Sequence, residues 1–333
     1  MGYLRKLVLA VALLSLALPG AAGAIPAPAP TAGELLASGL QGTTGATIGP
    51  DGALYVTEGA LGQITRINPK NGETETFASG LPKAVLPIGG AIDVAFIGKT
   101  AYALVTLVGT DVGGTDTVGI YRVDDADSFT VIADLGTFSS KNLPPYHVDL
   151  KTGLQFALQP IDGGFLVTDG HHNRVLRATL DGKVTDLTGD LGNVVPTGLA
   201  RRGNTVYMAE AGPIPHLPAT GKFVSFSLED PKVVTERASG CSLLVDVEFG
   251  RGRALYALSQ GDYSGNVEPA SPALPNSGKL LRANKDGTFS VVVDALNLPT
   301  SVDFAGDTAF VVTLTGEVWK IEDVSKLARR ESA

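Results

Sequence analysis

One short pattern recurs six times along this chain and constrains the fold more than any other feature. A polar turn precedes an apolar run that usually carries an aromatic residue near its middle. The copies are DGALYVTE (51–58), GKTAYALVT (98–106), DGGFLVTD (162–169), GNTVYMAE (203–210), RGRALYALS (251–259) and GDTAFVVTL (306–314). Recurrence at a spacing of roughly 40–60 residues is the mark of a repeat architecture.

Each copy lies within a unit of four short strands. In the first unit the strands are expected over 43–49, 53–58, 62–69 and 73–80, separated by turns that contain Asp-Gly or Asn-Gly. Short turns of this kind between strands favour antiparallel pairing. Radial units of this kind make a β-propeller, so the sequence predicts an all-β, six-bladed β-propeller. The innermost strands are expected to begin near Thr44, Ala91, Leu154, Pro196, Leu244 and Pro299.

The sixth unit lacks a fourth strand, and the start of the chain supplies a candidate for it. The segment GELLASGL (33–40) resembles the fourth-strand ending TFASGL (76–81). We therefore predict that the N-terminal strand closes the last blade, which removes two open sheet edges. The alternative is a chance similarity of small residues. The propeller would span 33–324, and the tail 325–333 would be frayed and solvated.

The first residues have the features of a secretory signal peptide over 1–24. A basic start at Arg5 and Lys6 precedes an apolar run that is too short to span a bilayer, and small residues follow at 22–24. An uncleaved anchor is the alternative. Residues 25–32 form a Pro/Ala-rich linker. The protein is therefore expected to be secreted or periplasmic, with no membrane contact after cleavage.

The charge and the cysteine count exclude some classes of function. The net charge is −8, and removal of residues 1–24 takes it to −10. An acidic surface repels phosphate backbones, so nucleic acid is not an expected partner. Cys241 is the only cysteine, so no internal disulfide can form and a packed core must hold the fold together. We interpret Cys241 as a small filler at a strand end rather than a nucleophile.

The lengths of the predicted links indicate which face binds ligands. Links between second and third strands lie on the same face as the connections between blades, and several are long: 105–119, 211–221 and 259–278, together with the blade connector 137–153. Long irregular loops on a rigid scaffold usually carry binding sites. This face also gathers the candidate ligand-binding residues His147, His171, His172, Glu210, His216 and Asp262. No histidine spacing matches a local metal signature.

Recurring carboxylates form a second set of candidates. Asp93, Asp246 and Asp303 are expected at matching places in the innermost strands, where Gln155 and Gly198 stand in blades three and four. Glu58, Asp169 and Glu210 recur at the ends of second strands. Oxygen ligands suit calcium or another divalent cation in the channel. The alternative is that these acids accept backbone amides from the next blade. The metal candidates are Asp93, Glu58, Asp169, Glu210, Asp246 and Asp303.

Two further patterns are interpreted as structural. The aromatic residues Tyr55, Tyr102, Tyr207, Tyr256 and Phe310 share one repeat position with Leu166, which favours packing between blades. In VTDGHHNRVLR (167–177), Asp169 and Arg174 flank a turn and can pair across it, and Asn173 is a turn residue. This hairpin resembles the NHL repeat.

Longer stretches carry a resemblance to one family. PPYHVDLKTGLQFALQP, GGFLVTDGHHNRVLR, VPTGLARRGNTVYMAEAGP, LLVDVEFGRGRALYALSQGD and LPTSVDF resemble the ScyD/ScyE family over residues 33–323. That resemblance implies an exported bacterial propeller related to NHL and SMP-30-like proteins, with no catalytic residues to carry over. The wider superfamily includes lactonases whose metal is held by Glu, Asn and Asp. Asn193 is the one asparagine that merits a test for that role.

Two functions remain open from the sequence. The first is a non-catalytic binding or scaffold propeller that holds a small molecule, a glycan or a protein on the loop-rich face over the central channel. The second is a metal-dependent lactonase or esterase, in which channel carboxylates hold a cation and His147 or His216 moves a proton. No Gly-x-Ser-x-Gly motif supports covalent catalysis.

Overall fold

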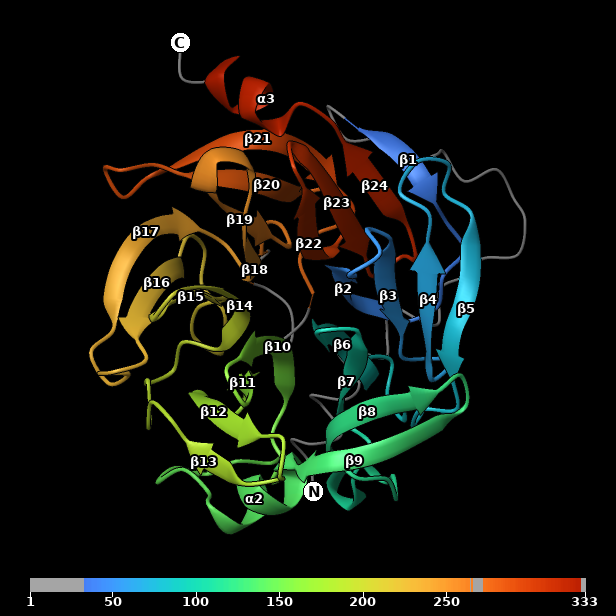
Figure 1. The fold of residues 1–333 in the computed structure, drawn as a ribbon. Helices are drawn as coiled ribbons and strands as arrows, with labels where there is room; N and C mark the ends of the chain where they lie inside the picture. The colour runs from blue at the N-terminus through green and yellow to red at the C-terminus, as the bar shows by residue number, and fades with distance from the viewer. Residues whose placement is uncertain (1–32, 264, 266–271, 331–333) are drawn as a thin grey trace.

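Six four-stranded antiparallel sheets surround a central axis in the computed structural model, which describes residues 33–263, 265 and 272–330. The six-bladed β-propeller is thereby confirmed, and Figure 1 looks along its axis with the innermost strands at the centre. The expected signal peptide and linker lie outside the described residues. No helix in the described part of the chain is long and apolar enough to cross a membrane.

Each blade is a meander of four consecutive strands, apart from the last. Blades one to three consist of β2 to β5 (Thr43–Ile48, Leu54–Glu58, Gln63–Ile67, Thr74–Ser79), β6 to β9 (Gly90–Ile97, Thr100–Thr106, Gly119–Asp125, Ser128–Asp134) and β10 to β13 (Gln155–Ile161, Gly164–Asp169, Arg174–Thr179, Val184–Asp186). Blades four and five consist of β14 to β17 (Pro196–Arg202, Thr205–Glu210, Gly221–Ser227, Thr235–Cys241) and β18 to β21 (Leu244–Phe249, Leu255–Ser259, Gly278–Ala283, Phe289–Leu296). The innermost strands begin within one residue of the predicted positions.

Blade six confirms the predicted ring closure. It contains β22 (Pro299–Ala305), β23 (Thr308–Thr313), β24 (Val318–Ile321) and, as its outer strand, β1 (Glu34–Ala37). Strand β1 pairs antiparallel with β24, and Leu35 stands opposite Trp319. The two ends of the described chain are therefore held in one sheet (Figure 1).

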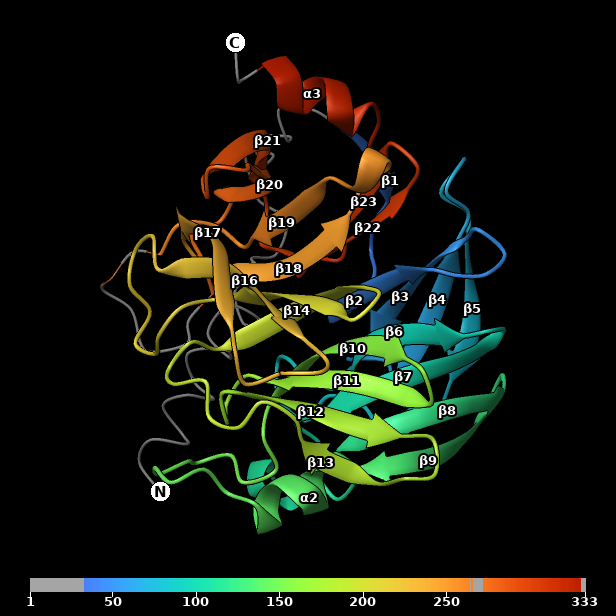
Figure 2. The same ribbon diagram turned by 60° about the vertical axis from the view of Figure 1, so that its left-hand side comes forward.

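Two helices and two short 3-10 turns complete the described structure: α2 (Leu135–Lys141), α3 (Val324–Arg330), η1 (Thr110–Val112) and η2 (Arg251–Arg253). The prediction of a frayed, solvated tail from 325 differs from the structure, because Val324 and Ala328 of α3 are buried in one apolar cluster with Val292 of β21. Figure 2 shows α3 beside β21. Burial of one apolar stripe stabilises a helix that is too short to persist alone.

Packing between blades uses the recurring aromatic position, as predicted. Tyr55 lies edge-on against Phe96 of blade two, with ring centroids 4.8 Å apart, and Tyr102 contacts Phe165 of blade three at 4.9 Å. Tyr256 contacts Phe304 of blade six at 4.9 Å. Each ring thus belongs to an apolar layer between two sheets, which is where a propeller buries most of its core.

The long links lie on one face of the disc, which we call the loop-rich face. It carries the links 107–118 and 211–220 between second and third strands, and the blade connectors such as 142–154. The described ends of a third such link, 260–263 and 272–277, lie there as well. In Figure 2 the link between β15 and β16 and the connector after α2 both project on the left side of the disc. The predicted loop asymmetry is therefore present in the fold.

Candidate functional site

A half-open cavity of about 80 Å³ occupies the axial channel at its loop-rich end. The lining residues come from the first halves of the innermost strands and from the ends of second strands, and they include Thr44, Asp93, Ala157, Asp246, Gln260 and Leu314. The walls are mostly small or apolar and include the acids Asp93 and Asp246. This volume accommodates a few water-sized groups.

The channel acids join neighbouring blades through backbone hydrogen bonds. The Oδ2 atom of Asp93 accepts the N–H of Leu158 in blade three at 2.7 Å. In the same way Asp246 accepts from Val302 of blade six at 2.8 Å, and Asp303 accepts from Ile48 of blade one at 2.5 Å. Each acid thus provides an acceptor for a backbone N–H on the innermost strand of the neighbouring blade. The interpretation as inter-blade contacts is supported for these three residues.

The predicted alignment of these acids is partly wrong. Asp93 stands opposite Leu104, and Asp246 stands opposite Leu258, so these two acids are equivalent. Asp303 stands opposite Phe310, two residues further along, where blade five has Glu248 opposite Tyr256. Ser301 occupies the place of Asp93 and Asp246 in blade six. Each innermost strand has a one-residue bulge near its start, before these acids, so the bulge does not cause the offset. Asp303 lies two residues closer to the turn at 306–307 than Asp93 lies to the turn at 98–99.

Blade three needs a similar correction. Gln155 stands opposite Asp169 at the very start of β10, so Ala157 lines the channel at the place where Gln155 was expected. Gly198 does take the corresponding place in blade four. A Cβ atom there would lie 2.3 Å from Oδ1 of Asp246. The glycine makes room for the neighbouring carboxylate.

Glu248 is a channel acid that the sequence reasoning missed. Burial raises the pKa of Glu248 well above its usual range, and the charge of Asp303 adds to the effect. Burial likewise raises the pKa of Asp93 well above its usual range, and that of Asp246 to about 7. Four carboxyl groups in one narrow channel disfavour one another's ionisation. The sequence LVDVEF indicates this position of Glu248, since Glu248 is two residues from Asp246 and residues two apart in a strand share one face.

The candidate metal ligands do not assemble into a site. Among the described residues, no group of three or more His, Cys, Asp or Glu side chains is placed to hold a metal ion. The axial acids are occupied by backbone amides, and Glu58 accepts hydrogen bonds from Gln41, Gln63 and Thr65. The donor set therefore does not fit a dedicated divalent-cation centre.

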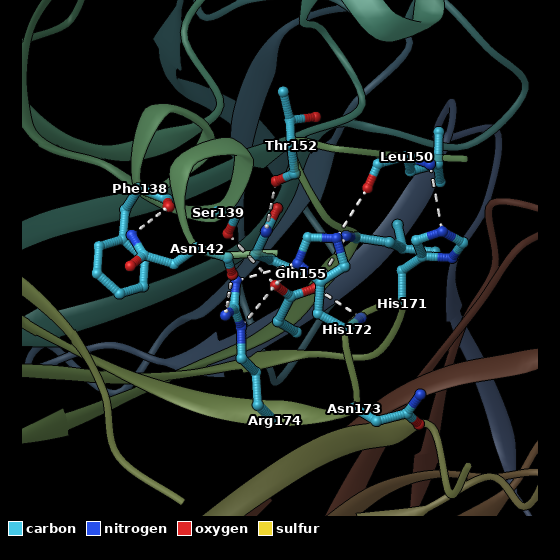
Figure 3. A network of polar contacts seen from close by, with 12 residues as sticks. Phe138, Ser139, Asn142, Leu150, Thr152, Gln155, His171, His172, Asn173 and Arg174 are labelled. Atoms are coloured by element: carbon cyan, nitrogen blue, oxygen red, sulfur yellow. Dashed lines mark hydrogen bonds and ion pairs between the residues drawn. The ribbon is translucent and has the colours of Figure 1, made fainter. Parts of the chain in front are cut away.

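In blade three, Asp169 forms the centre of a buried polar network. Figure 3 labels its partners Ser139, His172 and Arg174. The Oδ2 atom of Asp169 lies 3.1 Å from Nδ1 of His172 and 3.4 Å from Nε of Arg174, so the predicted pair across the hairpin is present. Ser139 of α2 also donates to Asp169. Burial alone would raise the pKa of Asp169, but the hydrogen bond and charge of His172 and the charge of Arg174 hold it below its usual value.

The two adjacent histidines bind both polar groups of one backbone residue. His171 Nε2 accepts the N–H of Leu150 at 3.2 Å, and His172 Nε2 lies 2.9 Å from the carbonyl oxygen of the same residue. Figure 3 shows both contacts. Burial lowers the pKa of His171, which keeps it in the neutral form that can accept. These histidines therefore anchor the connector 142–153 rather than facing a ligand.

Two other predicted ligand residues lie on the surface. The side chain of His147 is 87% exposed and contacts Asp149 at 3.1 Å. Asp262 forms an exposed ion pair with Lys279 at 2.9 Å. Asn193, which sequence reasoning singled out, donates to the carbonyl oxygen of Ile214 and accepts its N–H, at 2.8 and 2.9 Å. Its amide is thus used to hold the base of the 211–220 loop.

Glu210 and His216 differ from the other candidates, because each is buried without a full set of partners. Glu210 is 5% exposed and has no hydrogen bond or ion pair to any described residue; only the charges of Lys222 and Glu236 act on it. Burial raises its pKa to about 7. His216 is 8% exposed, its Nδ1 atom has no hydrogen-bond partner within the described ranges, and its ring lies edge-on to Tyr263 at 5.7 Å. Burial lowers the pKa of His216.

Comparisons with known proteins establish the fold class alone. No protein-family model and no curated protein matches the sequence. Among solved structures, a gluconolactonase from Xanthomonas campestris aligns with a TM-score of 0.61 at 13% identity, covering 91% of this chain and 99% of that one. An aldose sugar dehydrogenase from Streptomyces coelicolor in its PQQ-bound form gives a TM-score of 0.55 at 14% identity, covering 90% and 99%. A virginiamycin B lyase from Staphylococcus aureus gives 0.52 at 14%, covering 85% and 95%.

At 13–14% identity, these neighbours show that the chain shares their fold. The finer resemblance to the ScyD/ScyE family is not confirmed by them. Identities of this size carry no information on substrate, so the function must be argued from the site itself.

Proposed function

We propose that this protein is an extracytoplasmic binding propeller of the ScyD/ScyE type that holds a small molecule, a glycan or a protein segment on its loop-rich face. The observation that carries the proposal is the half-open cavity of about 80 Å³ at that end of the channel, with long loops around it. The signal peptide expected over 1–24 is the reason for the proposed location. The acidic charge argues against nucleic acid.

The internal contacts of the site favour binding over catalysis. Asp169, His171 and His172 hold the connector between blades two and three, and the channel acids join blades. The groups that remain available, Glu210 and His216, lie in or beside the 211–220 link of blade four. A rigid scaffold with few uncommitted polar groups suits recognition.

The test is a binding screen on matched loop variants. Wild-type protein is screened by thermal shift against a panel of sugars, sugar lactones and amines, and hits are repeated on variants in which short turns replace 211–221 or 261–277. Loss of a hit on either variant, with the fold retained by circular dichroism, supports the proposal. Hits that are unchanged on both variants would remove this face as the site.

A second candidate function is hydrolysis of a lactone or another ester, which the fold similarity to gluconolactonases favours. The described carboxylates do not supply a three-ligand metal set, so we derive no metal-dependent step. Glu210 is the group suited to accept a proton from water, since its pKa of about 7 lies near neutral pH. Gluconolactone hydrolysis above the spontaneous rate, abolished in Glu210→Gln, would favour this candidate. The same assay with a chelator and with added calcium tests for metal dependence.

A further inference from the structure

Three second strands end in an acid at the same register, which allows a direct comparison between blades. Glu58, Asp169 and Glu210 stand opposite the first residue of the innermost strand in blades one, three and four, where that residue is Thr43, Gln155 and Pro196. The repeat geometry therefore gives each acid the same two neighbours. One is the residue opposite it on the third strand, and the other is the end of the blade connector.

In blades one and three both neighbours donate to the acid. Glu58 accepts from the side chain of Gln63 on the third strand and from the N–H of Gln41 in the connector, at 2.8 and 2.7 Å. Asp169 contacts Arg174 on the third strand at 3.4 Å and accepts from the N–H of Leu154 at 3.2 Å. Both carboxylates are therefore fully used inside the protein.

In blade four both donors are directed elsewhere. Lys222, which stands opposite Glu210 on β16, forms an ion pair with Glu236 at 3.1 Å instead. The connector amides of Val194 and Val195 donate to Oδ1 of Asn173, at 3.0 and 2.9 Å. Glu210 therefore has no donor among the described residues, although the residue is only 5% exposed. Its carboxylate oxygens are not among the fully buried atoms, so a partner for them can come from solvent.

The surroundings of Glu210 favour a cation as that partner. Alternation along β15 places Glu210 on the same side of the sheet as Met208 and Val206, which belong to the apolar cluster between blades three and four. The nearby charges acting on Glu210 are those of Lys222 and Glu236, which form an ion pair with each other and leave no net positive charge there. An ionised carboxylate in this apolar position binds a charged donor more strongly than a neutral one.

We propose that Glu210 is the recognition group of the loop-rich face and that it binds an ammonium group of a small organic ligand entering between the 187–195 connector and the 211–220 link. This inference rests on the proposed binding function and assigns it a ligand class. In blade three the equivalent position is filled by the guanidinium of Arg174, so an external cation takes the place of an internal one.

The experiment uses n-butylamine as the probe and n-butanol as its uncharged counterpart of equal length. Glutamate carboxyl carbons are labelled with ¹³C, and the Glu210 resonance is assigned by its loss in Glu210→Gln. We expect butylamine to lower the apparent pKa of Glu210 and to bind about tenfold or more weakly to Glu210→Gln, because a charge-assisted hydrogen bond is lost. Butylamine binding should strengthen from pH 6 to 8, because the amine stays protonated while Glu210 ionises.

Glu229→Gln is the matched control, since it removes one exposed carboxylate from the same blade and leaves Glu210 and the Lys222–Glu236 pair in place. We expect it to change butylamine affinity by less than about threefold. Equal effects of butanol and butylamine, or no effect of butylamine on the Glu210 resonance, would overturn the ligand class. A Glu210 carboxyl that is already ionised below pH 4 in the free protein would show that Lys222 is its partner in solution. Compounds from the panel of sugars, sugar lactones and amines could bind in a way that depends on the loops but not on Glu210. That result would overturn this inference and leave the proposed function supported.

Discussion

The carboxylate of Asp246 in blade five accepts the backbone N–H of Val302 in blade six, with 2.8 Å between Oδ2 and the nitrogen. The same oxygen also accepts from the hydroxyl of Ser301 at 3.0 Å. Burial raises the pKa of Asp246 to about 7, far above the ordinary value of 3.8. One side chain therefore joins two blades and makes their contact sensitive to pH.

Asp246→Asn should weaken the pH dependence of stability. Because the folded pKa is raised, the protonated form is favoured by folding, and this contribution is present below pH 4 and lost as pH rises through about 7. We expect wild-type melting temperature to fall between pH 5 and 8. Asparagine keeps an acceptor for Val302 without the charge. At pH 8 the variant should therefore have a higher melting temperature than wild type, and its free energy of unfolding should be larger by about 1 kcal/mol. Differential scanning calorimetry measures this.

In Asp246→Asn the fall in melting temperature between pH 5 and 8 should become smaller but not disappear. The reason is that the pKa values of Asp93, Glu248 and Asp303 are raised as well. Asp262→Asn is the control, since Asp262 is an exposed rim acid paired with Lys279. A slope that is identical in wild type and Asp246→Asn would contradict the prediction.

Arg174→Met should destabilise the protein strongly. Arg174 is 4% exposed, contacts the buried Asp169 and donates to the carbonyl oxygen of Asn142 at 2.7 Å. Removing one partner of a buried ion pair leaves an uncompensated charge and costs about 3–5 kcal/mol. Urea unfolding measures the loss. Arg177→Met, on the exposed side of the same strand β12, should change stability by less than about 0.5 kcal/mol.

Acidification should release the connector 142–153 before the rest of the propeller. The pKa of His171 is lowered by burial and by the charge of His172, so its contribution to stability is complete above about 6.5 and is lost as pH falls through the lower folded pKa. Protonated His171 cannot accept the N–H of Leu150. Hydrogen exchange at the Leu150 amide, corrected for the intrinsic pH dependence, should show this loss of protection.

His171→Ala should remove the protection of Leu150 at every pH. His147→Ala should leave it unchanged, because the side chain of His147 is exposed and contacts only Asp149 among the described residues. Protection of Leu150 that survives in His171→Ala would show that another group holds the connector.

Removal of the N-terminal strand should open the ring. Strand β1 supplies the outer edge of blade six, and Ala37 of this strand is buried beside Val318. A chain that starts at residue 41 exposes the edge of β24, and we expect unfolding at lower urea concentration and association between molecules. Urea denaturation and sedimentation velocity measure both effects. A chain starting at residue 33 is the control.

Much of the fold follows from local sequence patterns. Asp-Gly and Asn-Gly turns, alternating apolar residues and the aromatic at one repeat position specify the six blades, since each is encoded within one unit. The match between 33–40 and other fourth strands revealed the closure for the same reason. The place of Asp303 is equally local, because it follows from the number of residues between Asp303 and the turn at 306–307; the similarity of SVDF to AIDVAF and LVDVEF gave the wrong alignment.

The sequence by itself determined the architecture, the loop-rich face and the residue types gathered there, because strand periodicity and turn chemistry are local properties. Only the tertiary structure shows which of these side chains form hydrogen bonds within the protein and which do not. His171 and Glu210 are both polar residues at the ends of second strands or in their turns, yet His171 holds Leu150 and Glu210 has no described partner. Hydrogen bonds between distant segments decide that difference, and no spacing within one repeat encodes them.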